Sequence, residues 1–174
     1  NLSHDFFSRA RVTEFPELFD VVVATNVLGH STDLWDFLWG VRRAIRSNGL
    51  LVIEVQYLSE LVRQAAFEMI YHEHVSYFDE HSLGALLVLK GFRPLGFEIT
   101  ETQGGTLRMW ASPSGGGFAP ECARSNWPAF RAQVEQRRRR VVPLLEHQRN
   151  SNKLACFYGA PAKATQLANF WKLG

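Results

Sequence analysis

Apolar positions along the chain follow two patterns in turn, continuous runs and helical spacing. A short, β-branched, nearly continuous apolar run at 19–26 is typical of a strand buried on both faces of a sheet. Apolar residues then recur at helical spacing between 34 and 45, and a second continuous apolar run follows at 50–58. Strand, helix and strand in this order predict a parallel βαβ unit.

The ends of the predicted helix carry capping residues. Ser31 or Thr32 is expected to be the N-cap, with the acidic Asp33 in the first turn. Asn48-Gly49 is expected to end the helix as a left-handed cap.

The remaining chain predicts further helices and an antiparallel hairpin. Gly104-Gly105 indicates a hairpin turn. Gly91 is expected to end the helix that begins at residue 80. The expected helices are 59–66, 80–92 and 127–148, and the expected strands are 93–103, 106–113 and a strand that runs into a helix start within 154–163. A parallel pair followed by a closing antiparallel hairpin predicts an α/β sheet, with ligands expected at the carboxyl ends of its strands, in the loops 26–30 and 56–57.

Composition narrows the class of protein. The chain has 174 residues, of which 46% are hydrophobic and 13% aromatic, and these values are typical of a globular protein. A formal net charge of +2 gives no argument for binding to nucleic acid or to an anionic membrane. The four arginines at 137–140 are expected to form a solvated helix face, since no aromatic residues are interleaved with them. No apolar run reaches the roughly 18 residues of a membrane span, and Cys122 and Cys156 lack a CxxC spacing, so a reducing, cytoplasmic setting is expected.

The segment IYHEHVSYF at 70–78 carries the most concentrated chemistry. It places Tyr71, His72, Glu73 and His74 side by side. A histidine titrates near neutral pH, a carboxylate can set its tautomer, and a tyrosine can donate to a developing oxyanion, so acid–base catalysis is the favoured interpretation. Metal ligation is less favoured, because HExxH spacing and an evident third ligand are absent. A polar surface loop is the alternative without function.

Three other polar residues stand at positions where ligands bind. His30 follows the first strand, where it is either a half-buried histidine that bonds local backbone or a functional residue. Arg108 in GGTLR can reach a phosphate from the hairpin. Lys163 ends the YGAPAK turn, where backbone N–H groups and the ammonium can hold a phosphate.

Five segments together resemble one family, the S-adenosylmethionine-dependent C-methyltransferases of deoxysugar biosynthesis, which act on nucleotide-linked keto-sugars. The YHEHxSYF stretch is the most specific of them. The segments cover nearly the whole chain and are DVVVATNVLGH (20–30), LLVIEVQYL (50–58), IYHEHVSYF (70–78), GGTLRMW (104–110) and YGAPAK (158–163).

The resemblance implies a fold and a cofactor. Residues 1–115 are expected to be the later half of a class I methyltransferase (Rossmann-like) sheet with its antiparallel closing hairpin. Residues 116–174 are expected to be a linker helix and the start of a C-terminal Rossmann-like domain. The chain is interpreted as a fragment, and zinc is expected only in an N-terminal module outside it. The methionine end of S-adenosylmethionine is expected at Asn26, Val27 and Leu28.

The resemblance also implies catalytic roles. The reaction forms a carbon–carbon bond beside a sugar ketone, so a base must remove the ring proton next to the carbonyl group. His74 is the first candidate for the base, with Tyr71 on the same side and Glu73 orienting an imidazole or holding the substrate. His30 is expected to hydrogen-bond the keto oxygen or to assist proton transfer.

The resemblance also implies substrate contacts. Tyr57, Arg108 and Lys163 are candidates for binding the nucleotide-sugar, the last two on its diphosphate side. The chain departs from the family where Gln56 replaces a proline, Gln103 replaces a histidine and Gly29 replaces an alanine. Gln103 is the departure that bears on substrate details.

Two other functions are compatible with the sequence. One is a class I methyltransferase that acts on oxygen or nitrogen, which has no special need for the YHEH segment. The other is a non-catalytic nucleotide-sugar binding fragment. The sequence does not indicate the sugar, the nucleotide, the ring carbon or the oligomeric state.

Overall fold

The computed structural model describes residues 7–15, 18–116, 125–151, 153–154, 156, 158–159 and 162–173. The chain divides into two compact units. One comprises Asn1–Leu58 with Val75–Ala123, and the other comprises Ser59–His74 with Arg124–Gly174. This division differs from the predicted boundary at 115/116: the two units meet at 123/124, and the segment 59–74 belongs to the same compact unit as the C-terminal helices.

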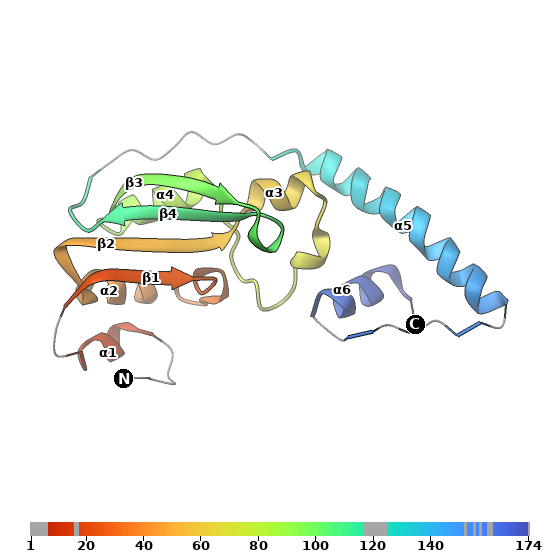
Figure 1. The fold of residues 1–174 in the computed structure, drawn as a ribbon, viewed down its shortest axis with the longest axis horizontal. Coiled ribbons are helices and arrows are strands. Elements are labelled where there is room, and N and C mark those ends of the chain that lie inside the picture. The colour runs from red at the N-terminus through yellow and green to blue at the C-terminus, as the bar shows by residue number, and fades with distance from the viewer. Residues whose placement is uncertain are drawn as a thin grey trace. The chain divides into compact units, whose positions relative to one another are not determined.

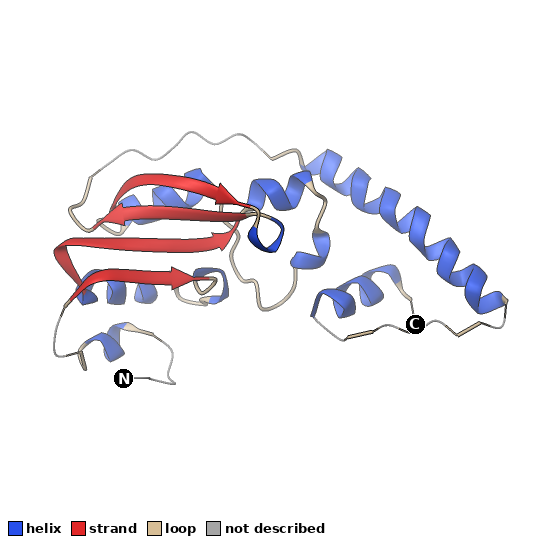
Figure 2. Ribbon diagram, viewed as in Figure 1, coloured by secondary structure: helices blue, strands red, loops and turns tan. Residues whose placement is uncertain are grey.

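The first unit contains a four-stranded sheet. Its strands are β1 (Phe19–Thr25), β2 (Ile45–Gln56), β3 (Arg93–Thr100) and β4 (Thr106–Ser112), in the order β1-β2-β4-β3. β1 and β2 are parallel, and β4 is antiparallel to both of its neighbours, as the arrows in Figure 2 show. The predicted α/β sheet with an antiparallel closing hairpin is therefore confirmed.

Two helices cover one face of this sheet. They are α2 (Leu34–Ala44) and α4 (Glu80–Leu89), which lie on the same side of the strands in Figure 1. Alternate residues of β2, at 51, 53 and 55, point to this side and are at most 2% exposed. They pack with buried side chains of α2, α4 and β4 in one hydrophobic cluster, which is the core of the unit.

The other face of β1 is open in the described residues. The side chains of Val21 and Val23 are 53% and 62% exposed. The expectation that this strand is buried on both faces is therefore wrong for the structure described, because α2 and α4 lie on the same side of the sheet.

The boundaries of α2 differ from the prediction at both ends. Its N-cap is Asp33, whose carboxylate accepts a hydrogen bond from the N–H of Asp36. The helix ends at Ala44, and Asn48-Gly49 lies inside β2 instead of capping the helix. A Cβ at Gly49 would come within 2.9 Å of the Asp20 carbonyl oxygen, so close approach of backbone explains the glycine.

The other predicted helix of the first unit is confirmed. α4 begins with a capping box between Asp79 and Ser82, and Gly91, at φ 76°, follows its C-terminus. A short helix, α1 (Arg9–Val12), precedes β1.

The second unit is helical in its described part. It contains α3 (Leu58–Arg63), a 3₁₀ turn (Phe67–Met69), α5 (Trp127–Asn150) and α6 (Ala162–Trp171). The strand expected before α6 includes 155 and 157, which lie outside the described residues. Among the described helices, none is long and apolar enough to cross a membrane.

Candidate functional site

The loop after β1 is shaped by a left-handed residue. Asn26 has φ 53°, and its N–H donates a 2.8 Å hydrogen bond to the Glu54 carbonyl of β2. The chain then turns through a 3₁₀ turn, Leu28–His30. Asn26 and Val27 consequently lie at the carboxyl end of the parallel pair, where ligands of open α/β sheets bind.

A cavity of about 640 Å³ opens at this loop, a size that suits a small-molecule ligand. Its lining combines amide, imidazole, carboxylate and aromatic groups, and it includes Asn26, Val27, His30, Asp33, Asp36 and Phe37. Both carboxylates are held in place, since that of Asp33 accepts from the Asp36 N–H and that of Asp36 accepts from the Arg9 N–H at 3.0 Å. The arrangement suits a ligand that carries positive charge.

Leu28 lies differently from its two neighbours. Its side chain is fully buried in the hydrophobic core of the first unit. Leu28 as a whole is 0% exposed, and it is not among the residues that line the cavity, so the described structure does not present it to a ligand at this loop.

The same loop is bonded to the segment that follows the YHEH motif. The Gly29 carbonyl accepts hydrogen bonds from the N–H groups of Val75 and Ser76, at 2.8 and 3.1 Å. Tyr57, at the end of β2, pairs with Phe78 in an isolated parallel bridge and donates its N–H to the Gly105 carbonyl at 3.1 Å. Backbone bonds thus bring the two predicted ligand loops, 26–30 and 56–57, and the hairpin turn at 104–105 to one edge of the first unit.

Tyr71 and His74 form a hydrogen-bonded pair in the second unit. The segment is a turn, closed by a 2.9 Å bond from the His74 N–H to the Tyr71 carbonyl. Nδ1 of His74 lies 2.8 Å from the Met69 carbonyl oxygen, and Nε2 lies 3.1 Å from the Tyr71 hydroxyl. A carbonyl only accepts, so Nδ1 carries a proton. When the ring is neutral, Nε2 is the acceptor and the hydroxyl of Tyr71 donates to it.

The other two residues of the motif face solvent. The side chains of His72 and Glu73 are 84% and 59% exposed, and Nε2 of His72 lies 3.8 Å from a carboxylate oxygen of Glu73. Because the segment is a turn and not a strand, the two histidines of the motif differ in surroundings: His74 is bonded on both ring nitrogens and His72 is exposed.

Arg108 is held between two carboxylates across three strands. It lies opposite Glu54 of β2 and Glu98 of β3, and its guanidinium bonds to them at 2.7–2.8 Å and 2.6 Å. Hydrogen bonding to Glu54, opposed by some burial, raises the pKa of Arg108. Its charge is already neutralised by these partners, so the geometry favours a role in the sheet over phosphate binding.

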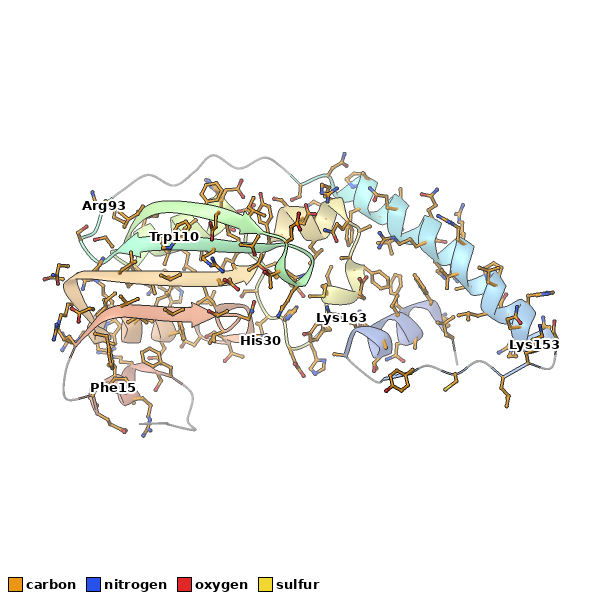
Figure 3. All side chains as sticks on the ribbon, viewed as in Figure 1. Phe15, His30, Arg93, Trp110, Lys153 and Lys163 are labelled. Carbon is orange, nitrogen blue, oxygen red and sulfur yellow. The ribbon has the colours of Figure 1, made fainter. Side chains whose placement is uncertain are left out.

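Lys163 projects from the start of α6, in the same compact unit as Tyr71 and His74 (Figure 3). Its side chain is exposed. His30 belongs to the first unit. The structure thus places the predicted residues in two groups, one at the carboxyl ends of the strands and one in the helical unit.

Two groups with clear contacts were not predicted from the sequence. One is the Met69 carbonyl, which sets the tautomer of His74, and a backbone acceptor carries no sequence signal. The other is Arg137, whose guanidinium donates to the carbonyls of Gln64 and Ala65. Arg137 is exposed, as the predicted solvated face requires, but its partners lie more than 70 positions away in sequence and could not be read from the run itself. Among the described residues, no group of three or more histidine, cysteine or acidic side chains is arranged to hold a metal ion.

Comparison with known proteins gives family matches at both ends of the chain. A family described as "Methyltransferase domain" matches residues 1–95, and one described as "C-methyltransferase C-terminal domain" matches residues 121–174. C-methyltransferase NovU of Streptomyces niveus is 27% identical over 169 residues, which cover 88% of this chain and 40% of that protein. The chain therefore spans well under half the length of this relative.

Two solved structures show weaker similarity. The 1,6-didemethyltoxoflavin-N1-methyltransferase of Burkholderia thailandensis, solved with S-adenosylhomocysteine, has 20% identity and a TM-score of 0.46 over 58% of this chain and 47% of its own. Magnesium protoporphyrin IX methyltransferase of Synechocystis PCC 6803 has 14% identity and a TM-score of 0.44 over 58% and 48%.

The family matches confirm the resemblance to C-methyltransferases that the sequence predicts. More than half of the chain, residues 1–95 of 174, matches the methyltransferase domain. The chain belongs to the methyltransferase family.

Proposed function

We propose that this chain is part of an S-adenosylmethionine-dependent C-methyltransferase that methylates a ring carbon adjacent to a ketone of a nucleotide-linked deoxysugar. Residues 1–115 are then the later half of its methyltransferase domain, and residues 116–174 are a linker helix and the start of a Rossmann-like domain. The matches to residues 1–95 and 121–174, on either side of the proposed boundary, support this division.

The observation that carries the proposal is the bonded pair of Tyr71 and His74. With Nδ1 held by the Met69 carbonyl, Nε2 of His74 is the basic atom, and it accepts from the Tyr71 hydroxyl. The pair can therefore accept a proton from a carbon next to a ketone, either at Nε2 directly or through the Tyr71 oxygen, with His74 as the final acceptor. Methyl transfer to oxygen or nitrogen has less need of such a base, because those atoms already carry a lone pair of electrons that can attack the methyl group.

The cavity at Asn26, Val27 and His30 is the proposed site of the methionine end of the cofactor. Bound there, S-adenosylmethionine supplies an electrophilic methyl group on a positively charged sulfur. The carboxylates of Asp33 and Asp36 at the cavity offer favourable electrostatics to the cationic ligand. His30, which lines the same cavity, is proposed to bond the keto oxygen and stabilise the enolate.

Glu73, Tyr57 and Lys163 are proposed substrate contacts. Glu73 and Lys163 are exposed and charged, so both are available to a polar ligand. Lys163 can meet a diphosphate group from the start of α6. Arg108 is the weakest of the substrate candidates, because two carboxylates already bind its guanidinium.

A deuterium-exchange assay tests proton removal separately from methyl transfer. The intact protein is incubated in D₂O with a nucleotide-linked keto-deoxysugar and S-adenosylhomocysteine, and the ring protons are followed by NMR. Exchange at the carbon beside the ketone is expected, and it should be slowed strongly by His74→Asn. With S-adenosylmethionine instead, mass spectrometry and NMR of the product should show one new methyl group on that carbon.

Other outcomes decide between the alternatives. A methyl group found on oxygen or nitrogen would replace the proposal with a heteroatom methyltransferase. Tight binding of the nucleotide-sugar without exchange or transfer would support a non-catalytic binding protein.

A further inference from the structure

Arg137 of α5 binds the end of α3, within the helical unit. Its Nη1 donates to the Ala65 carbonyl at 2.9 Å and its Nη2 donates to the Gln64 carbonyl. α3 ends at Arg63, and the carbonyl groups at a helix end have no partner within the helix. The two arms of one guanidinium therefore satisfy two neighbouring acceptors where the chain leaves the helix.

The chain turns sharply at this point. Ala65 is fully buried and has φ 49°, a conformation that is unfavourable for a residue with a Cβ. Contacts from elsewhere must hold it there. The hydrogen bond from Arg137 to its carbonyl is such a contact.

The residues that follow Ala65 are held by apolar side chains of the two C-terminal helices, α5 and α6. Ala65 and Phe67 share a buried cluster with Val134 of α5 and Trp171 of α6. The ring centroid of Phe67 lies 5.8 Å from that of Trp171. The beginning of the segment 64–74 is thus bound by polar contacts from α5 and by apolar contacts from both helices.

Short-range hydrogen bonds connect this anchored turn to His74. The N–H of Met69 donates to the Ala66 carbonyl at 3.1 Å, and the N–H of Ile70 donates to the Phe67 carbonyl at 2.9 Å. The orientation of the Met69 carbonyl is therefore set by the turn that begins at Ala65. That carbonyl is the group to which Nδ1 of His74 is bonded.

We propose that Arg137 is a positioning residue for the Tyr71–His74 pair, so that α5 helps to organise the catalytic segment. The proposal rests on the function proposed above for that pair. Arg137 has no contact with the pair itself in the interactions described. It acts through the Gln64 and Ala65 carbonyls and the turn at Phe67–Met69, and it thereby holds the Met69 carbonyl that selects the tautomer of His74.

The neighbouring arginines provide matched controls. Arg138 and Arg139 pair with Glu135 on the same helix, at 3.2 and 3.4 Å, and Arg139 is 77% exposed. Such ion pairs on a helix surface contribute little to the free energy of folding. A lysine at 137 offers one compact ammonium in place of a planar fork, so it can keep the charge but reproduces the two bonds poorly.

The test uses the intact protein with Arg137→Gln, Arg137→Lys and the control Arg139→Gln. Arg137→Gln is expected to lower kcat by about 10–100-fold, since small misplacements of catalytic groups have effects of this size. The Kd of Arg137→Gln for S-adenosylmethionine should stay within about twofold of the wild-type value. The kcat of Arg137→Lys should lie between that of the wild type and that of Arg137→Gln. Arg139→Gln should be indistinguishable from wild type.

A double-mutant cycle with His74→Asn separates positioning from general stability. If Arg137 acts through His74, Arg137→Gln should have almost no further effect on turnover in the His74→Asn background. An equal effect in both backgrounds, or wild-type kcat in the folded Arg137→Gln protein, would overturn the proposal.

Amide hydrogen exchange gives a readout that does not depend on activity. Arg137→Gln should speed exchange in peptides that cover residues 64–74 and leave peptides from β2 and β4 unchanged, whereas Arg139→Gln should change neither. Unchanged exchange over 64–74 would overturn the positioning role. An inactive wild-type protein with the expected exchange pattern would instead count against the proposed function alone.

Discussion

The hydroxyl of Tyr71 lies 3.1 Å from Nε2 of His74, and the centroids of the two rings are 4.2 Å apart. The pair is built within a single turn of four residues, so its geometry is set locally. The 2.8 Å contact of Nδ1 with the Met69 carbonyl leaves Nε2 as the accepting atom. A histidine whose Nε2 acts as an acceptor is the form that a general base requires.

Replacing His74 should therefore affect turnover much more than binding. His74→Asn is expected to lower kcat by about 10²–10⁴-fold, with a far smaller change in the Kd of the nucleotide-sugar. Tyr71→Phe, which keeps the ring and removes the hydroxyl, should also lower kcat. Steady-state kinetics and calorimetric titration measure the two effects, and His72→Asn is the matched control, since its side chain is 84% exposed. Equal losses in turnover and in affinity would contradict a role for His74 as base.

The carboxylate partners of Arg108 predict an effect on stability. Glu54 has only 10% of its side chain exposed, so Arg108→Met would leave a buried carboxylate without its strongest partner. The free energy of unfolding should fall, and it should fall by more than in Glu98→Gln, because the side chain of Glu98 is 46% exposed. Urea unfolding measures both. Unchanged stability with weaker binding of the nucleotide-sugar would support the phosphate-binding role instead.

Two glycines of the first unit should respond differently to alanine. Among the described residues, a Cβ at Gly29 would meet only the Ser76 carbonyl oxygen, at 3.4 Å. A Cβ at Gly49 would come within 2.6 Å of Cγ1 of Ile45 and 2.9 Å of the Asp20 carbonyl oxygen. Gly29→Ala is therefore expected to change the free energy of unfolding by no more than about 1 kcal/mol, and Gly49→Ala to lower it by about 1–3 kcal/mol. Thermal and urea unfolding of the two variants, side by side, make the comparison. Similar losses at both positions would show that the loop at Gly29 is packed more tightly than described.

The lowered pKa of the Glu60 carboxyl group predicts that the free energy of unfolding depends on pH. Hydrogen bonds from Arg63 and Gln64 lower the pKa of its carboxyl group to about 2, from 4.5. A pKa that is lower in the folded state stabilises the fold above the unfolded pKa, and this stabilisation is lost as the pH falls from about 4.5 to about 2. Arg63 is 71% exposed, so the contribution is on the order of 1 kcal/mol after solvent screening.

The difference in unfolding free energy between wild type and Glu60→Gln measures this contribution. It should be constant from pH 5 to 8 and should shrink towards zero between about pH 4.5 and 2. Glu146→Gln removes one exposed carboxylate from the same unit and controls for the change in net charge. A difference that is independent of pH down to 2 would show that Glu60 is not stabilised by its neighbours.

Elements with strong local signals were predicted correctly from the sequence. The apolar runs of β1 and β2, the periodic apolar stripe of α2 and the glycine pair after β3 are recognised from residues within a few positions of one another. Hairpin turns and helix periodicity are interactions of that range, so the α/β order follows from the sequence. The YHEH segment likewise indicates the family from neighbouring residues alone, and its acid–base role stays a prediction.

Contacts between distant residues were decided only by the tertiary structure. Gly49 lies in a strand and not in a helix cap because the Asp20 carbonyl of β1 approaches it. Arg108 meets Glu54 because β4 pairs with β2, and Arg137 meets Ala65 across 72 positions of sequence. Periodicity and capping residues report the few residues on either side of a position, whereas these partners are brought together by strand pairing and helix packing. The sequence therefore determined which residues could carry chemistry, and the packing determined what each of them binds.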